Sequence, residues 1–257
     1  MVATTARSAG SQPVRFYLWI TALCAAFAFL AFSATYWLQL AAGTFKGGTG
    51  LLHLHAALFS AWVVLLLSQA WLVSRRSLAL HRAWGVAGVS LATAMVLVGL
   101  ATAHHSVTSY LAQGYGDKAR AFYILPFGSV VEFGLFFLAA VLNISRPEWH
   151  KRLMIVATAA ALQAAAARIG FAMAVGTGPG IRPGLTPPPP VETGAQGAAM
   201  VCLLLAAGAV YDWRTRGRPH PAWLIGLAVI LLVGFAGPAL TATPAWLGFV
   251  DAMMRFG

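Results

Sequence analysis

Seven blocks of apolar residues, each about 20 residues long, dominate the sequence. A helix of about 20 apolar residues crosses the roughly 30 Å hydrocarbon core of a bilayer. Charged residues make up only 9% of the chain, and they lie with proline and glycine between the blocks. The sequence therefore predicts an all-α, polytopic integral membrane bundle of seven transmembrane helices. The expected spans are 16–40, 51–73, 81–103, 121–143, 150–175, 193–211 and 221–241.

The positive charges predict how the bundle is oriented. The net charge is +11, and eleven of the 17 Lys and Arg residues fall on one side of the seven-span topology. Short loops rich in Lys and Arg stay in the cytoplasm. We expect the N-terminus inside and the C-terminus outside, in a bacterial cytoplasmic (inner) membrane, and nothing points to a nucleic acid. The eleven are Arg7, Arg15, Arg75, Arg76, Arg82, Arg146, Lys151, Arg152, Arg214, Arg216 and Arg218.

The chain is expected to consist of one membrane domain with two flanking segments. Residues 1–15 are expected to form a cytoplasmic tail, and 16–241 the transmembrane domain with its histidine-bearing core at 51–175. The first span is too long for a signal peptide and is interpreted as a retained anchor. Residues 242–257 are expected to lie outside at the interface, because apolar residues follow Pro244 at helical spacing. The loop 176–191, rich in proline, is interpreted as an extended spacer rather than a lid.

Five of the seven histidines lie where an apolar span meets a polar loop. The topology sorts the histidines into an outer group and an inner group, while His220, in a basic loop, is interpreted as solvated. His53 and His105 are interpreted as interfacial residues that bond to water or headgroups. The outer group is His53, His55, His104 and His105, and the inner group is His81 and His150.

Three histidines head stripes of residues that share one helix face, because their spacing is three or four residues. The stripes are dominated by small side chains on two of the spans. Small residues allow close helix packing in lipid, and they would also let a flat macrocycle lie against the backbone. The stripes are His55, Phe59, Trp62, Leu66 and Gln69; His81, Gly85, Gly88, Ala92, Met95 and Gly99; and His150, Met154, Ala157, Ala161, Ala164 and Arg168.

Two charged residues, Glu132 and Arg168, fall inside the spans. Ionisable residues within the bilayer face the bundle interior and generally have a partner. Their depths below the outer face are within side-chain reach, so we expect a buried ion pair between them. The pair is interpreted either as structural or as functional, with Glu132 relaying protons or Arg168 holding an anion such as a haem propionate.

Several short motifs resemble those of a bacterial family of multi-pass membrane proteins of unknown function. They are His55 early in one span (LHLHAALFSAW), His81-Arg82-x-x-Gly85 (HRAWG), His150-Lys151-Arg152-x-Met154 (HKRLM) and Arg168 near the far end of that span (AAARI). The resemblance covers less than half of the chain. That family in turn resembles, more distantly, the membrane b-type cytochromes, so the resemblance implies redox chemistry with histidine-held haem.

The first functional hypothesis is therefore an electron-transfer protein with haem b. His81 and His150 would be the axial ligands, Arg82 and Arg152 would pair with the propionates, and a quinone or another redox partner would exchange electrons. An alternative ligand pair is His55 with His104. A single haem, or a single metal ion held by His81 and His150, is expected near one face, because His81 and His104 are too far apart for the usual stacked pair of haems.

Two other classes remain open. A non-haem metal enzyme acting on lipid needs close clusters of histidines and carboxylates, which this sequence lacks. A non-catalytic membrane protein, such as an assembly factor, a structural subunit or a small transporter, would use the histidines only as interfacial hydrogen-bonding groups. The sequence leaves open whether the protein is an enzyme.

Overall fold

The structure is a computed structural model that describes residues 11–255, the side chains of residues 11–14 excepted. Most of the expected cytoplasmic tail, 1–15, lies outside the described residues. Within them, seven helical segments are long and apolar enough to cross a membrane, which confirms the predicted polytopic all-α bundle. They are α1 (Ser11–Phe32) continued by η1 (Ser33–Trp37) and α2 (Leu38–Ala41), α3 (Gly50–Ser74), α4 (Leu78–Ala112), α5 (Gly116–Phe122) with α6 (Ile124–Leu142), α7 (Pro147–Val175), α8 (Thr193–Arg216) and α9 (Pro221–Thr241).

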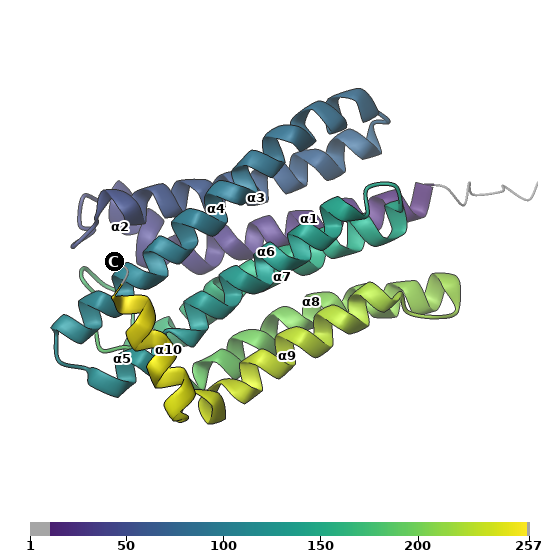
Figure 1. Cartoon of the computed structure of the whole chain (residues 1–257). Helices are drawn as coiled ribbons and strands as arrows, with labels where there is room; N and C mark the ends of the chain where they lie inside the picture. The colour runs from purple at the N-terminus through teal and green to yellow at the C-terminus, as the bar shows by residue number, and fades with distance from the viewer. Residues whose placement is uncertain (1–10, 256–257) are drawn as a thin grey trace, which may run out of the picture.

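Helix α7 is the central element of the bundle. It packs against α1, α6, α8 and α9, and 56% of its most apolar stretch is buried, against 33% or less in the other spans. Figure 1 shows the hairpin of α3 and α4 on one side of α1, α6 and α7, with the hairpin of α8 and α9 on the other side. Alanine is the commonest residue at the buried α7 positions, which lets four helices approach it closely.

Local sequence signals fix where several helices begin and end. Thr49 caps α3, since its side chain accepts a hydrogen bond from the Leu52 backbone N–H at 3.2 Å. Pro147 opens α7 at a position where the missing N–H costs nothing. Gly217 ends α8 with φ of 76°, a left-handed conformation that glycine adopts without strain.

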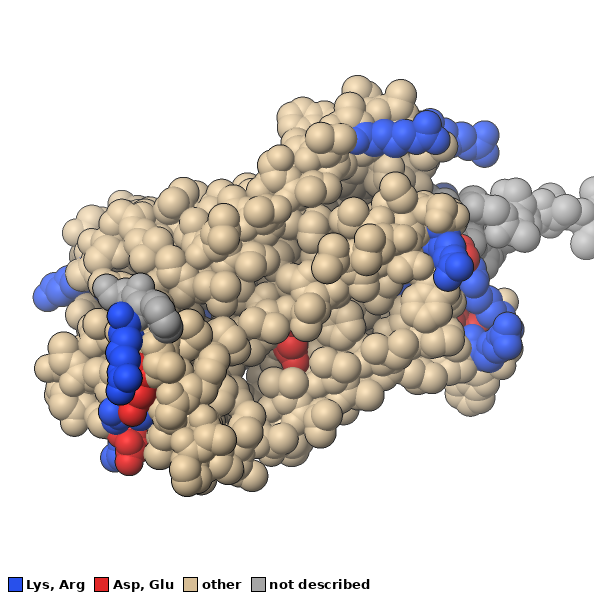
Figure 2. All heavy atoms as spheres, in the orientation of Figure 1, with Lys and Arg blue, Asp and Glu red and all other residues tan. Residues whose placement is uncertain are grey.

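The surface fits a bilayer. In Figure 2 charged atoms gather at the two ends of the molecule, and the visible surface between them is uncharged apart from one acidic group in a hollow. Large apolar side chains face outward along this middle zone, which is the arrangement expected where lipid is the solvent. Examples are Trp19, Leu30, Val86, Leu97, Leu203, Leu232 and Phe235. We call the end with the α3–α4, α6–α7 and α8–α9 turns the basic end.

Two helices differ from the sequence-based expectation. Helix α4 continues from the predicted end at residue 103 to Ala112, because its last turns contain no proline or glycine and Gly114 is the first break. His104 therefore lies within a helix rather than at its end. A final helix, α10 (Pro244–Met254), does form after Pro244. Trp246 and Val250 of α10 are buried against the opposite end of the bundle from the basic end.

Candidate functional site

A large cavity opens in the half of the bundle away from the basic end. Its volume is about 1360 Å³, which exceeds the roughly 300–1,000 Å³ of most small-molecule sites. The walls come from α1, η1, α3, α4, α6, α7, the start of α8 and the loop between α7 and α8. The N–H of Trp62 donates to the Thr158 hydroxyl at 3.1 Å, and this buried pair forms its floor near mid-membrane.

The walls of the cavity are mainly apolar. Helix α7 contributes small side chains, among them Ala161 and Ala164, and the facing helices contribute aromatic rings, among them Phe32 and Phe59. The predicted stripes from His55 on α3 and towards Arg168 on α7 thus do meet at one space. Small residues on one wall and rings on the others leave room for a bulky apolar molecule.

His55 is a polar group of this wall. Its ring stacks on Phe59 with the centroids 4.1 Å apart. The Nδ1 atom is buried and has no hydrogen-bond partner among the described residues, while Arg168 lies within electrostatic reach. A hydrogen bond at one ring nitrogen usually fixes the orientation of a histidine. The Nδ1 of His55 lacks such a bond among the described residues.

Thr35 borders the same space from η1. Its side chain is 3% exposed, and its hydroxyl is buried without a hydrogen-bond partner among the described residues. A threonine in an α-helix usually bonds back to a carbonyl one turn earlier, but η1 is a π-helical turn. Such turns are rare and are often found at functional sites. Nothing in the sequence identifies this turn in advance.

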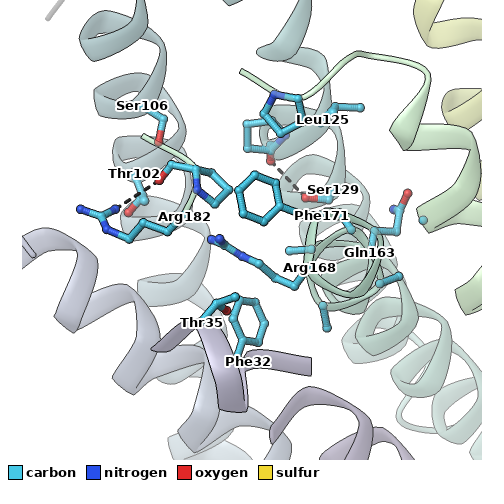
Figure 3. A pocket seen from close by; sticks show the side chains of 18 of the residues that line it. Phe32, Thr35, Thr102, Ser106, Leu125, Ser129, Gln163, Arg168, Phe171 and Arg182 are labelled. Atoms are coloured by element: carbon cyan, nitrogen blue, oxygen red, sulfur yellow. Dashed lines mark hydrogen bonds between the residues drawn. The ribbon is translucent and has the colours of Figure 1, made fainter. Parts of the chain in front are cut away.

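Arg168 projects from α7 into the cavity. Figure 3 shows the Arg168 guanidinium beside Phe32. It points towards the part of the cavity wall where Thr102, Ser106 and Arg182 lie. The guanidinium carbon is 5.4 Å from the centroid of the Phe32 ring. No ion pair or hydrogen bond of the described residues involves the Arg168 side chain.

The loop from Gly176 to Glu192 covers the cavity, which makes it more than a spacer. Arg182 fastens this loop, since its Nε donates to the Lys46 carbonyl at 2.9 Å and its other nitrogens donate to the Gly47 and Pro183 carbonyls. The Gly184 N–H donates to the Tyr110 hydroxyl at 2.7 Å. Burial lowers the pKa of Arg182, but its N–H groups already have acceptors.

Glu132 does not pair with Arg168. Its Oε2 accepts a hydrogen bond from Gln163 at 2.6 Å, and its other oxygen is buried without a partner among the described residues. Glu132 does not line the cavity, whereas Gln163 does. The depths of Glu132 and Arg168 are compatible with a pair, but no ion pair joins them among the described residues.

At the basic end, His81 and His150 lie within electrostatic reach of each other. The His150 Nδ1 bonds to the Ala140 carbonyl at 2.9 Å, which orients its ring as ligand histidines often are oriented. The His81 Nδ1 is buried and lacks a hydrogen-bond partner among the described residues. Neither histidine borders the cavity. The structure thus places the two rings at one end of the bundle, away from this cavity.

The two arginines expected to bind haem propionates, Arg82 and Arg152, do not border the cavity. Arg82 is exposed. Arg152 is 1% exposed, and all three of its nitrogens donate to acceptors of this chain, to Asp212 at 2.5 and 2.7 Å and to Glu148 at 2.7 and 2.8 Å. Arg216 also pairs with Glu148. Sequence reasoning missed this network, because Glu148 and Asp212 lie at the borders of spans and resemble ordinary solvated charges.

The remaining histidines have separate surroundings. His53 bonds through Nδ1 to the Tyr36 hydroxyl at 2.8 Å. His104 does not border the cavity, whereas His105 does, so the expected combination of His55 with His104 is not brought together at this space. His220 caps α9, because its Nδ1 accepts from the Ala222 N–H at 3.2 Å, and it is not simply a solvated loop residue.

Comparison with known proteins adds no family to this geometry. No family model matches the chain, and no curated protein or solved structure matches it. Among the described residues, no three His, Cys, Asp or Glu side chains are gathered where they could hold a metal ion.

Proposed function

We propose that the protein binds a large, mainly apolar molecule in the membrane-embedded cavity. The observation that carries this proposal is the cavity of about 1360 Å³ within a bundle of seven apolar spans. Ligand sites are typically concave and apolar, with a few polar groups that fix orientation. His55, Thr35, Gln163 and Arg168 are such groups here.

The same chemistry is shared by a membrane lipid, a quinone and a haem, each with a bulky apolar body and a polar part. Haem b is the cofactor that the histidine motifs imply. Within the cavity, His55 would hold its iron and Arg168 a propionate, and bound haem would supply one-electron transfer. The cavity favours this placement over His81 and His150, because His55 and Arg168 border it whereas His81 and His150 do not.

The proposal is tested by identifying what the protein retains. The protein is purified in a mild detergent, and the bound molecules are extracted into organic solvent and measured by mass spectrometry. Ala164→Trp, which fills the cavity, should sharply reduce the retained molecule. Ala87→Trp is the matched control, because Ala87 is exposed on α4 and does not border the cavity. Equal retention by both variants would contradict the proposal.

A visible spectrum of the same sample distinguishes haem from the other molecules. If haem is bound here, its reduced-state bands should disappear in His55→Ala and persist in His81→Ala and His150→Ala. The opposite pattern would place haem at the basic end, as the histidine stripes alone suggest. A colourless protein that retains lipid or quinone would support the binding function and would exclude haem as the bound molecule.

A further inference from the structure

Arg168 differs from every other arginine that the structure describes. The exposed arginines lie at the ends of the spans or in loops, and one of them, Arg216, pairs with Glu148. Among the buried or half-buried ones, Arg120 pairs with Asp117 and Asp251, Arg152 with Asp212 and Glu148, and Arg182 with backbone carbonyls. Arg168 alone is half-buried in a membrane span with no acceptor among the described residues.

The cavity around Arg168 has no carboxylate to neutralise it. Its described lining includes two arginines and no Asp or Glu. Glu132 is held by Gln163 and is not an electrostatic neighbour of Arg168. A charge inside the bilayer is costly unless it is paired. The positive potential of this space is therefore suited to an anion that does not belong to the chain.

The hydroxyls of Thr35, Thr102 and Ser106 also line this space, and that of Thr102 already donates to the Val98 carbonyl at 2.7 Å. The Thr35 hydroxyl is more than nine-tenths buried, faces the cavity and lacks a partner among the described residues. The hydroxyls of Thr102 and Ser106 lie on the side towards which Arg168 points (Figure 3). A guanidinium with hydroxyls around it is the arrangement that recognises carboxylate and phosphate oxygens, since arginine offers two parallel N–H donors.

We infer that the molecule held in the cavity is an amphipathic anion, whose carboxylate or phosphate head pairs with Arg168 and Thr35 while its apolar body fills the alanine-lined space. This inference rests on the proposed binding function and narrows it. A neutral quinone does not fit this inference, because it has no anionic head. The molecules that fit it are a fatty acid, an acidic lipid or lipid phosphate, and a haem with its propionates.

The test compares three probes with the same sixteen-carbon chain: hexadecanoate, hexadecyl phosphate and hexadecanol. Each displaces a fluorescent fatty acid from the purified full-length protein in detergent. One charge-assisted hydrogen-bonded pair is worth about tenfold or more in affinity. We therefore expect at least one of the two anions to bind about tenfold or more tightly than the alcohol, and the better anion identifies the head group.

The variants separate charge from shape. Arg168→Gln should bring the better anion to the affinity of the alcohol, Arg168→Lys should keep part of the preference, and Thr35→Val should weaken the anion alone. Arg255→Gln is the control, because Arg255 is exposed and does not border the cavity.

The two proposals fail in different ways. If all three probes bind equally to the unchanged protein, or if Arg168→Gln keeps the preference for the anion, the inference of an anionic head is overturned while binding stands. If the fluorescent fatty acid and all three probes fail to bind, and Ala164→Trp retains as much extracted molecule as Ala87→Trp, the binding function itself is contradicted. Retained hexadecanol binding in Arg168→Gln shows that this variant still folds.

Discussion

Arg152 and Arg168 lie on the same helix, but of these two only Arg152 forms ion pairs among the described residues. Arg152 is fully buried and donates to Asp212 and Glu148, so Arg152→Gln strands a buried carboxylate and should cost about 3 to 5 kcal/mol. Asp212→Asn should cost a similar amount, and the double variant less than the sum. Arg168→Gln should cost much less, because no carboxylate of the chain depends on it. Unfolding by a denaturing detergent, followed by tryptophan fluorescence, measures all four; strictly additive losses for the Arg152 and Asp212 pair would contradict the network.

Glu132 should be energetically coupled to Gln163 and not to Arg168. The hydrogen bond of 2.6 Å joins Glu132 to Gln163, and neighbours that share a bond show coupling of about 0.5 to 3 kcal/mol. The measurement is a pair of double-mutant cycles, Glu132→Gln with Gln163→Leu and Glu132→Gln with Arg168→Gln. Coupling in the second cycle and additivity in the first would restore the ion pair expected from the sequence.

His220 should make the α8–α9 turn sensitive to pH. Burial lowers the pKa of His220, nearby Arg152 lowers it further and Asp212 raises it, and its Nδ1 must be unprotonated to accept from Ala222. Because the unfolded histidine has a pKa near 6.5, it binds the proton first as pH falls. Stability should thus be full above about pH 7 and decline below about pH 6.5. Thermal unfolding of His220→Asn, which keeps a cap but does not titrate, should show a smaller decline, because the buried rings of His55 and His81 remain.

At the scale of the elements, replacing a glycine by alanine tests how closely two helices pack at that position. A side chain at Gly208 would lie 2.6 Å from the buried ring of Trp223, so Gly208→Ala should destabilise the α8–α9 packing by about 1 to 3 kcal/mol. Gly85 has open space around it, and Gly85→Ala should stabilise α4 by about 0.5 to 1 kcal/mol. Thermal unfolding of the two variants measures the difference. Equal effects would mean that the α8–α9 hairpin is looser than described.

These elements show what the sequence can predict. Hydropathy finds the seven spans because lipid demands long apolar helices, but it does not end α4 correctly, since a helix can continue into water beyond the membrane. Helical spacing places His55 and Arg168 on inward faces. It cannot tell that Glu132 turns to Gln163, because depth along a helix does not give the direction across the bundle.

The residues around Arg168 were harder to find. Thr35 lies in a π-helical turn whose residues have no distinctive pattern, and Arg182 lies in a proline-rich loop that resembles a spacer. His105 borders the cavity whereas its neighbour His104 does not, because one step along a helix turns a side chain by about 100°. A cavity is formed by segments distant in sequence, and only the fold brings these residues together.

At the scale of the whole molecule, orientation follows from the charge distribution. A reporter fused after Gly257 should behave as extracytoplasmic, because eleven Lys and Arg residues lie on the side of the N-terminus. An alkaline phosphatase fusion, active only outside the cytoplasm, and a fluorescent protein fusion, active inside, give opposite readings. Fluorescence without phosphatase activity would reverse the topology and place the cavity in the cytoplasmic half of the membrane.

The bonded pair of Trp62 and Thr158 closes the cavity near mid-membrane, and the Arg152 network ties α7 to α8 below it. The space is consequently a pouch and not a pore. Its lining extends from the loop between α7 and α8 to the pair of Trp62 and Thr158, and it includes no residue of the turns at the basic end. A molecule bound there would reach the basic end only if contacts of α7 with α3 and α8 were broken, among them the ion pair of Arg152 and Asp212.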